Sequence, residues 1–288
     1  MRTDNKIAHK IALAFLASTL VVGAASGTAL AGRGGSPQAI QSAIDANSVD
    51  AIQAELERSE HLVCSGCTDM VLPLVDHLNY RVRQAAAWWL ARRGTSRQVY
   101  VQMLNRLSQS DSTLARNAAD VLGEFRAGSS IPALSAALSN PIFTGEARAA
   151  MAQALGNLGN SAAAAPLTQA LTVQDPLVKA AALQALRSVP GFHDGTVAVS
   201  LVGDADSQVR SEAAVTLGIL HTTAGANALV QALASDPSAL VRKKAAWALG
   251  EMNAPLSVAG TPLQLAATND TNPFVRSIAQ VAISRLAQ

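Results

Sequence analysis

A ten-residue pattern recurs seven times along this chain, and its spacing constrains the fold more than any other feature. The pattern reads apolar, basic, any, any, Ala, small or Leu, any, any, Leu, Gly, and residues 241–250 (VRKKAAWALG) are its clearest copy. The copies begin at Val82, Leu114, Ala147, Val178, Val209, Val241 and Val275, at steps of 31 to 34 residues. A fixed period in this range is typical of a solenoid, in which each unit buries its apolar face only against its neighbours.

The spacing within each copy predicts a helix that is buried along one side. Positions one, five, eight and nine of the pattern are mostly apolar, which is the i, i+4, i+7, i+8 stripe of such a helix. The glycine at position ten falls near the expected helix end, and we expect Gly94 and Gly159, a turn later, to adopt the left-handed conformation.

A second apolar run precedes many copies, as in residues 131–138, 165–171 and 228–233. Between the two runs stand Asp175-Pro176, Asp236-Pro237 and Asn272-Pro273, which predict a turn and an N-cap for the helix that follows. Each unit is therefore predicted to be a helix, a tight turn and a second helix, with no strands. Aromatic residues make up only 3% of the chain, so Ala and Leu are expected to fill the core.

These residues resemble the HEAT-repeat family, in particular the short HEAT-like repeats of the phycobilin lyase type. The segment from Asp236-Pro237 through Val241-Arg242 to Leu249-Gly250 carries the resemblance most clearly. It implies an all-α fold, a right-handed α-α solenoid of about seven HEAT-like helix pairs with an N-terminal helical cap. Ala115 departs from the pattern at the basic position and Arg187 at the glycine position.

The chain divides into three predicted segments. Residues 1–31 have the layout of a signal peptide, with Lys6 and Lys10 before an apolar run and Ala29-Leu30-Ala31 as the cleavage site. Residues 32–66 are predicted to be a linker and a helical cap with helices over 38–46 and 48–60, where Glu55, Glu57 and Glu60 keep one face polar. Residues 67–288 are predicted to be the solenoid.

The leader predicts export, to the periplasm or the medium, with no stable membrane span after cleavage. Removing it takes away Arg2, Lys6, Lys10 and Asp4, so the 22 basic and 20 acidic residues become 19 of each. A balanced charge argues against nucleic acid as the partner.

Cys64 and Cys67 are the chain's two cysteines, and they form a Cys-Ser-Gly-Cys motif. Three interpretations stay open: a local disulfide between the cap and the first repeat, a redox-active pair, and a metal site completed by His61 and His77. The expected interpretation is the disulfide, with no metal and no cofactor.

Basic residues recur at position two of the pattern, and they are expected to form a column along the solenoid. The column is either an anion-binding stripe or a set of ion pairs with turn acids and carbonyl groups of neighbouring repeats; we expect the ion pairs. Its members are Arg83, Arg148, Lys179, Arg210, Arg242 and Arg276.

Position seven is more informative about binding, because it lies off the apolar stripe on the side that HEAT solenoids usually turn toward their concave surface. Two of the three tryptophans, Trp88 and Trp247, occupy it, while the third, Trp89, faces the core. Arg92 and Lys243 stand near them. We therefore predict a binding surface that includes Trp88, Trp247, Arg92 and Lys243, because tryptophan is enriched among interface hot spots.

The sequence offers no catalytic residues. HEAT-like hydroxylases carry His-Glu pairs for iron, and no His-Glu dipeptide occurs here. The sequence predicts an exported, non-catalytic scaffold that binds another protein or a peptide on its concave face. The alternative is a redox or metal-handling accessory protein that uses the region of Cys64 and Cys67.

Overall fold

The computed structural model describes residues 35–64 and 66–287. The chain divides by its contacts into Met1–Arg33 and Gly34–Gln288, and the described residues all belong to the second unit. The predicted signal peptide, residues 1–31, therefore lies outside the described residues.

The second unit is built from helices, and its described residues contain no strand. Helices α1 (Pro37–Asp45) and α2 (Val49–Arg58) come first, close to the two helices predicted for the cap. The helices that contain the ten-residue pattern are α4 (Tyr80–Leu90), α6 (Ser112–Phe125), α8 (Gly145–Asn157), α10 (Pro176–Leu186), α11 (Ser207–Ile219), α13 (Ala239–Glu251) and α15 (Pro273–Leu286).

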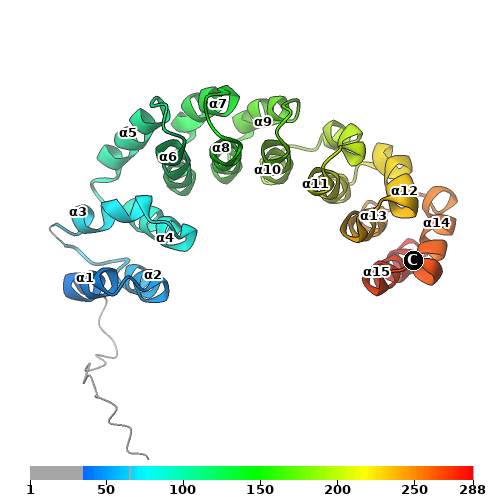
Figure 1. The fold of residues 1–288 in the computed structure, drawn as a ribbon, viewed down its shortest axis with the longest axis horizontal. Coiled ribbons are helices and arrows are strands. Elements are labelled where there is room, and N and C mark those ends of the chain that lie inside the picture. The colour runs from blue at the N-terminus through cyan, green and yellow to red at the C-terminus, as the bar shows by residue number, and fades with distance from the viewer. Residues whose placement is uncertain (1–34, 65, 288) are drawn as a thin grey trace, which may run out of the picture. The chain divides into compact units, whose positions relative to one another are not determined.

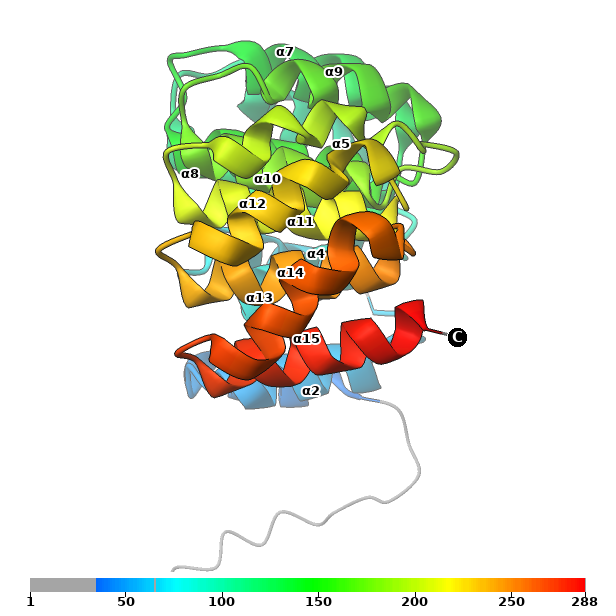
Figure 2. The ribbon, with the colours of Figure 1, turned by 90° about the vertical axis from the view of Figure 1, so that its right-hand side faces the viewer.

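The helices that precede them are α3 (Cys67–Val71), which continues into the 3₁₀ helix η1 (Leu72–Asp76), α5 (Ser96–Leu107), α7 (Ile131–Ser139), α9 (Ala164–Ala170), α12 (Ala226–Ser235) and α14 (Leu256–Asn269). Single 3₁₀ turns, η2 (Gly128–Ser130), η3 (Ser161–Ala163) and η6 (Thr223–Gly225), lead into α7, α9 and α12. Within this unit the helices form two layers, with the pattern-bearing helices on the inner side and the preceding helices on the outer side (Figure 1). Figure 2 looks along the stack from α15 and shows successive helices lying one behind another.

Side-chain caps fix where the inner helices begin. The residue three positions before each pattern is the N-cap, and in most copies its side chain accepts hydrogen bonds from the backbone, as Asp175 does from Leu177 N at 2.9 Å. The caps predicted at Asp175 and Asn272 are confirmed. The prediction for Asp236 is wrong, because the N-cap of α13 is Ser238 and Asp236 is the C-cap of α12.

The predicted buried stripe is present. In α11 the residues at positions one, five, eight and nine, Val209, Ala213, Thr216 and Leu217, are all fully buried. Val215 at position seven of the same helix is only half-buried. The register of the repeat is therefore as the sequence predicts.

The glycine at position ten allows adjacent inner helices to approach closely. A Cβ on Gly156 would lie 2.9 Å from Cα of Ala185, and one on Gly250 would lie 2.9 Å from Cα of Ala282. Gly123 meets Ala154 and Gly218 meets Ala248 in the same way. In each case the partner is position eight of the next copy, so a small residue faces a small residue at every such crossing.

The left-handed residues after the inner helices agree only in part with the prediction. Gly159 has φ +61°, as expected. The prediction for Gly94 is wrong, because Gly94 does not adopt a positive φ. At the place equivalent to Gly159, Arg126, His221 and Asn253 have φ near +50°.

One outer position departs from the predicted helix pair. The segment before α11 contains only the 3₁₀ helices η4 (Gly195–Ala198) and η5 (Ser200–Gly203), not an α-helix. Its terminal glycines and its β-branched residues (Thr196, Val197, Val199, Val202) are all weaker helix formers than the Ala and Leu of the other outer helices.

Candidate functional site

Three hollows lie side by side on the inner helices. The first, of about 420 Å³, is lined by Gln53, Glu57, Arg81, Gln84, Ala85, Trp88 and Glu124. The second is small and is lined by residues of α4, α6 and α8; it shares Gln84 and Glu124 with the first. The third, of about 270 Å³, shares Asp120, Ala150 and Gln153 with the second and extends to Gln184 and Gln208. The hollows adjoin one another through these shared residues, and the surface along which they lie is called here the inner-face groove.

The register of α4 places Trp88 in this groove. Trp88 lies off the buried stripe of the helix: it is half-buried, packs against the edge of the core and lines the first hollow, whereas Trp89 is fully buried. Trp89 is held there because its Nε1 donates to Ser59 Oγ at 2.9 Å. The interpretation that Trp88 lies on the inner side and Trp89 in the core is therefore correct.

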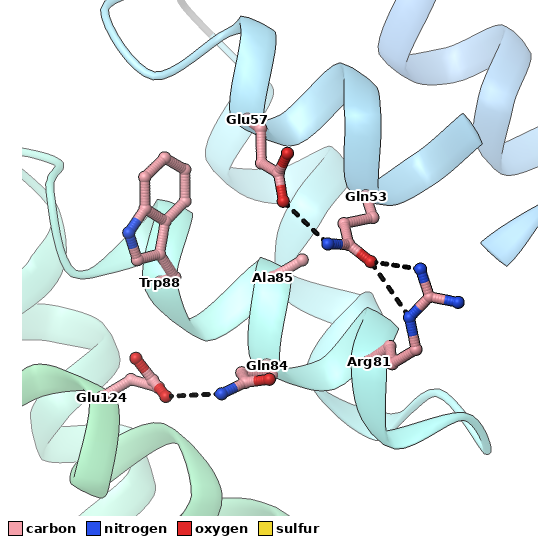
Figure 3. A pocket seen from close by; sticks show the side chains of 7 residues that line it. All are labelled: Gln53, Glu57, Arg81, Gln84, Ala85, Trp88 and Glu124. Carbon is pink, nitrogen blue, oxygen red and sulfur yellow. Dashed lines mark hydrogen bonds between the residues drawn. The ribbon is translucent and has the colours of Figure 1, made fainter. Parts of the chain in front are cut away.

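Amide and carboxylate side chains surround Trp88 in the first hollow (Figure 3). Gln53 Nε2 donates to Glu57 Oε1 at 2.8 Å, and Gln84 Nε2 donates to Glu124 Oε1 at 3.2 Å. Gln53 Oε1 in turn accepts from Nε and Nη2 of Arg81, at 3.1 and 2.7 Å. Because α2, α4 and α6 each supply part of this lining, the hollow forms only when these three helices are stacked.

Arg92 is engaged within the protein. Its guanidinium lies 4.2 Å from the centroid of the Trp88 ring, and its Nε is 3.1 Å from Glu60 Oε1. Such stacking lowers the energy of a cation by about 0.5–1 kcal/mol at exposed sites. The predicted binding residue Arg92 therefore already covers part of the indole that it was expected to accompany.

A buried ion pair lies beneath the middle of the groove. Arg83 Nε is 3.1 Å from Asp120 Oδ2, and Arg83 Nη1 also donates to the carbonyl groups of His77 and Leu78 at 3.0 Å. Burial raises the pKa of Asp120 above its usual value, even though the charge of Arg83 opposes that change. The pair links α4 to α6 at the floor of the groove.

Most of the basic column forms ion pairs between repeats rather than an open stripe, and Arg148 and Arg276 instead donate to the carbonyl groups of Leu138 and Asp270. Arg210 makes two hydrogen bonds to Asp236, Nε to Oδ2 at 2.7 Å and Nη2 to Oδ1 at 3.0 Å. Arg242 binds Asp270 in the same bidentate way, and Lys179 pairs with Asp204. The expectation of ion pairs with turn acids is confirmed at these three places.

These contacts change the acidity of the turn aspartates. Burial by itself would raise the pKa of Asp236, but the hydrogen bonds from Arg210 and from the Ser238 backbone outweigh it and hold the pKa below its usual value. For Asp270 the hydrogen bond from Arg242 is the largest effect and also lowers the pKa. The pairs are therefore ionised, and they favour the stacked arrangement at neutral pH.

The junction between α10 and α11 is polar where the neighbouring junctions are apolar. Arg187 stands in the place of the glycine, and its Nη1 donates to Glu212 Oε2 at 2.8 Å and to Thr216 Oγ1 at 3.3 Å. Thr216 occupies the position that Ala154, Ala185, Ala248 and Ala282 occupy in other copies. Arg187 and Thr216 thus replace the close contact of two small residues with hydrogen bonds.

Trp247 and Lys243 lie on α13, further along the inner layer, and the structure does not bring them to Trp88. The helices α6, α8, α10 and α11 stand between α4 and α13 in the stack. Trp247 is half-buried, and its ring lies over Gly218 of the preceding inner helix, with Cζ3 2.8 Å from where a Cβ would be. Lys243 is partly exposed.

Cys64 and Cys67 form a disulfide, with their Cα atoms 5.5 Å apart. Cys67 is fully buried at the start of α3. The other two members of the alternative metal site lie elsewhere: His61 is exposed, and His77 Nε2 is 3.3 Å from Asn47 Oδ1. In the described part of the chain, no three His, Cys, Asp or Glu side chains gather as a metal site would need.

The sequence interpretation missed the part of the groove that comes from α2. Glu57 was assigned to a polar face with Glu55 and Glu60, and Gln53 was not singled out, but both Gln53 and Glu57 line the hollow beside Trp88. The other two acids assigned to that face bind arginines: Glu55 pairs with Arg58 within α2, and Glu60, just after the helix, pairs with Arg92. The available signal was the i, i+4 spacing of Gln53 and Glu57 beside the buried Ile52 and Leu56.

The layered helix pairs, the repeated small-residue crossings and the inter-repeat ion pairs define an α-solenoid protein. The sequence profile of HEAT repeats matches residues 100–187 and 196–284, which is more than half of the chain. The chain belongs to the HEAT-repeat family. The gap between the two matches, residues 188–195, begins directly after Arg187 and ends at the first residue of η4.

Solved structures with a similar fold include the Escherichia coli protein YibA, at 16% identity and a TM-score of 0.54 over 87% of this chain and 92% of that one. The karyopherin Kap121p, bound to the extreme C-terminus of the protein phosphatase Cdc14p, is 15% identical with a TM-score of 0.54 over 86% of this chain and 33% of that one. The complex of CpcE and CpcF of the phycocyanin lyase from Nostoc is 21% identical with a TM-score of 0.43, over 78% and 96%.

No curated protein sequence matches the chain. Within residues 35–64 and 66–287, no helix has the length and apolar character that a membrane crossing requires.

Proposed function

We propose that this protein is an exported, non-catalytic scaffold that binds another protein, or a peptide segment of one, along the inner-face groove. The observation that carries the proposal is the row of adjoining hollows across α2, α4, α6, α8, α10 and α11. A surface of this length with a half-buried tryptophan at one end suits an extended protein segment better than a small molecule.

The chemistry of the groove supports this proposal. Gln84, Gln153 and Gln184 lie along it, and each side-chain amide offers both a donor and an acceptor to a backbone peptide group. The fold neighbour Kap121p binds a protein C-terminus, which is consistent with the same use of a stacked-helix surface. Export rests on the sequence of residues 1–31, and the absence of catalysis rests on the lack of a recognisable catalytic motif.

A site-specific photo-cross-linker tests the binding face. Gln153 on α8 and Gln169 on α9 are both exposed glutamines on adjacent repeats, but Gln153 lines the groove and Gln169 lies on the outer helix. We expect a benzoyl-phenylalanine at position 153 to form a discrete cross-linked product in cells and the same group at position 169 to form none. Equal products from both positions, or a product only from position 169, would refute the assignment of the binding face.

Cell fractionation tests export independently. The exported protein is expected to begin at Gly32, after Ala29-Leu30-Ala31. Recovery of the chain with residues 1–31 intact in the cytosolic fraction would contradict the proposal of export and would leave the binding face to be judged by cross-linking alone.

A further inference from the structure

The hollow around Trp88 contains two carboxylates that form no ion pair. The hydrogen bonds to Glu57 and Glu124 come from the neutral amides of Gln53 and Gln84. In the described part of the chain, neither carboxylate has a lysine, arginine or histidine nitrogen within ion-pair distance. This contrasts with Glu60, Asp120 and Asp236, each of which is paired with an arginine.

The arginines around the hollow bind groups other than Glu57 and Glu124. Arg81 Nη1 is 2.9 Å from Asp50 Oδ1, and its Nε and Nη2 bind Gln53. Arg92 is held by Glu60 and stacks on the indole. The charges of both arginines are thus offset by acids outside the hollow, and the lining itself keeps the uncompensated negative charge of Glu57 and Glu124.

The indole supplies the third element of a cation site. Trp88 is half-buried, and Figure 3 shows that its side chain lines the same hollow as the side chains of Glu57 and Glu124. Arg92 already stacks on part of this ring, at 4.2 Å and in the geometry of a cation–π contact, but Arg92 does not line the hollow, where Trp88 itself is accessible. A volume of about 420 Å³ is large enough for a long basic side chain.

We propose that this hollow receives a basic side chain, an arginine or a lysine, presented by the bound protein or peptide. The inference rests on the proposed function and specifies that the partner residue bound in this hollow is positively charged. A guanidinium or ammonium group there makes charge-assisted hydrogen bonds to Glu57 and Glu124 and contacts the indole of Trp88. Gln53 and Gln84 keep the two carboxylates oriented through their amide groups.

Small probes test the proposal without the partner. The purified protein, labelled with ¹⁵N, is titrated with N-acetyl-L-arginine methylamide while the indole N–H signal of Trp88 is followed by NMR and assigned by Trp88→Phe. N-acetyl-L-citrulline methylamide has nearly the same shape without the charge. We expect a saturable shift with the arginine probe and several-fold weaker binding of the citrulline probe, because each charged pair at a partly exposed site changes binding by up to about fivefold.

Charge-neutralising variants identify the carboxylates. Glu57→Gln combined with Glu124→Gln keeps the size of both side chains, and we expect it to weaken the arginine probe by on the order of tenfold, since each exposed pair contributes up to about fivefold. Glu146→Gln is the matched control, because Glu146 lines the third hollow and already faces Arg116 at 4.0 Å. That control is expected to bind the probe as the unchanged protein does.

Three results would overturn the inference: no shift of the Trp88 signal, equal binding of the arginine and citrulline probes, or unchanged binding by the double variant. Each of these leaves the cross-linking at position 153 unaffected, so the scaffold proposal would stand with a different partner chemistry. Loss of that cross-linking together with intact arginine binding would instead remove the proposed function and leave a cation site.

Discussion

The close crossing of α8 and α10 makes a specific prediction about Gly156. An alanine there would place its Cβ 2.9 Å from both Cα and Cβ of Ala185 and 3.2 Å from the carbonyl oxygen of that residue. Ordinary contacts of a Cβ are 3.4–4 Å, and the obstacle is backbone rather than a flexible side chain. The two helices therefore have to move apart before Gly156→Ala can fold.

Two opposing effects set the magnitude. Overpacking of this kind costs about 1–3 kcal/mol, whereas replacing a helical glycine by alanine contributes about 1 kcal/mol of helix propensity. We expect Gly156→Ala to lower the free energy of unfolding by about 1 kcal/mol. Gly260 in α14 is the matched control, because a Cβ there would meet its nearest atom, Leu256 Cδ2, at 3.6 Å. Gly260→Ala keeps the propensity gain without the clash and should stabilise by about 1 kcal/mol.

Urea unfolding followed by circular dichroism measures both variants against the unchanged protein. The informative quantity is the difference between the two variants, about 2 kcal/mol, because the propensity effect cancels in it. If Gly156→Ala stabilises the protein as much as Gly260→Ala, the inner helices are not in the close contact described here, and the role assigned to position ten is wrong.

Further predictions concern the core, the groove and the turn acids. Leu217→Ala, at a fully buried site, should destabilise by about 2–5 kcal/mol in urea titration, while Ile219→Ala, 43% exposed, should cost well under half of that; equal effects would mean that the register is misread. Trp89→Ala should cost about 3–5 kcal/mol and Trp88→Ala much less, as thermal unfolding will show; the reverse order would place Trp88 in the core. Because the folded pKa of Asp270 is lowered, its contribution to stability is complete above about pH 4 and is lost as the pH falls through the folded pKa. Asp270→Asn should therefore make the free energy of unfolding fall less steeply as the pH is lowered below about 4. An unchanged pH dependence would contradict the ion pair with Arg242.

The fold was predictable because the repeat carries its own register. The apolar positions of α11 identify its buried side, and Asp175 and Asn272 identify where α10 and α15 begin. The wrong predictions concern residues that can make two different kinds of interaction. Asp236 precedes a proline and reads as an N-cap, but the guanidinium of Arg210 gives it a stronger interaction across the repeat boundary.

The groove was predictable only in part, because its walls come from different repeats. The position of Trp88 off the buried stripe follows from the spacing in one helix. The contributions of Gln53 and Glu124 depend on how α2 and α6 stack on α4, which no single copy of the pattern contains. The engagement of Arg92 with Glu60 likewise joins residues 32 apart in the chain, and the sequence contains no local signal for it.

The pairing of position ten with position eight has a consequence for how such a chain changes its length. The contacts Gly218–Ala248 and Gly250–Ala282 join the same kinds of residue, and Arg210–Asp236 and Arg242–Asp270 do so as well. Deleting residues 241–274 would bring Gly218 to Ala282 and leave Arg210 with its aspartate, so unequal recombination at this place removes a whole repeat and keeps both kinds of contact between the repeats that remain. The contact of Arg187 with Glu212 and Thr216, by contrast, occurs once among the described repeats. A deletion or duplication with its boundary at this contact would place Arg187 or Thr216 against a residue that does not match it.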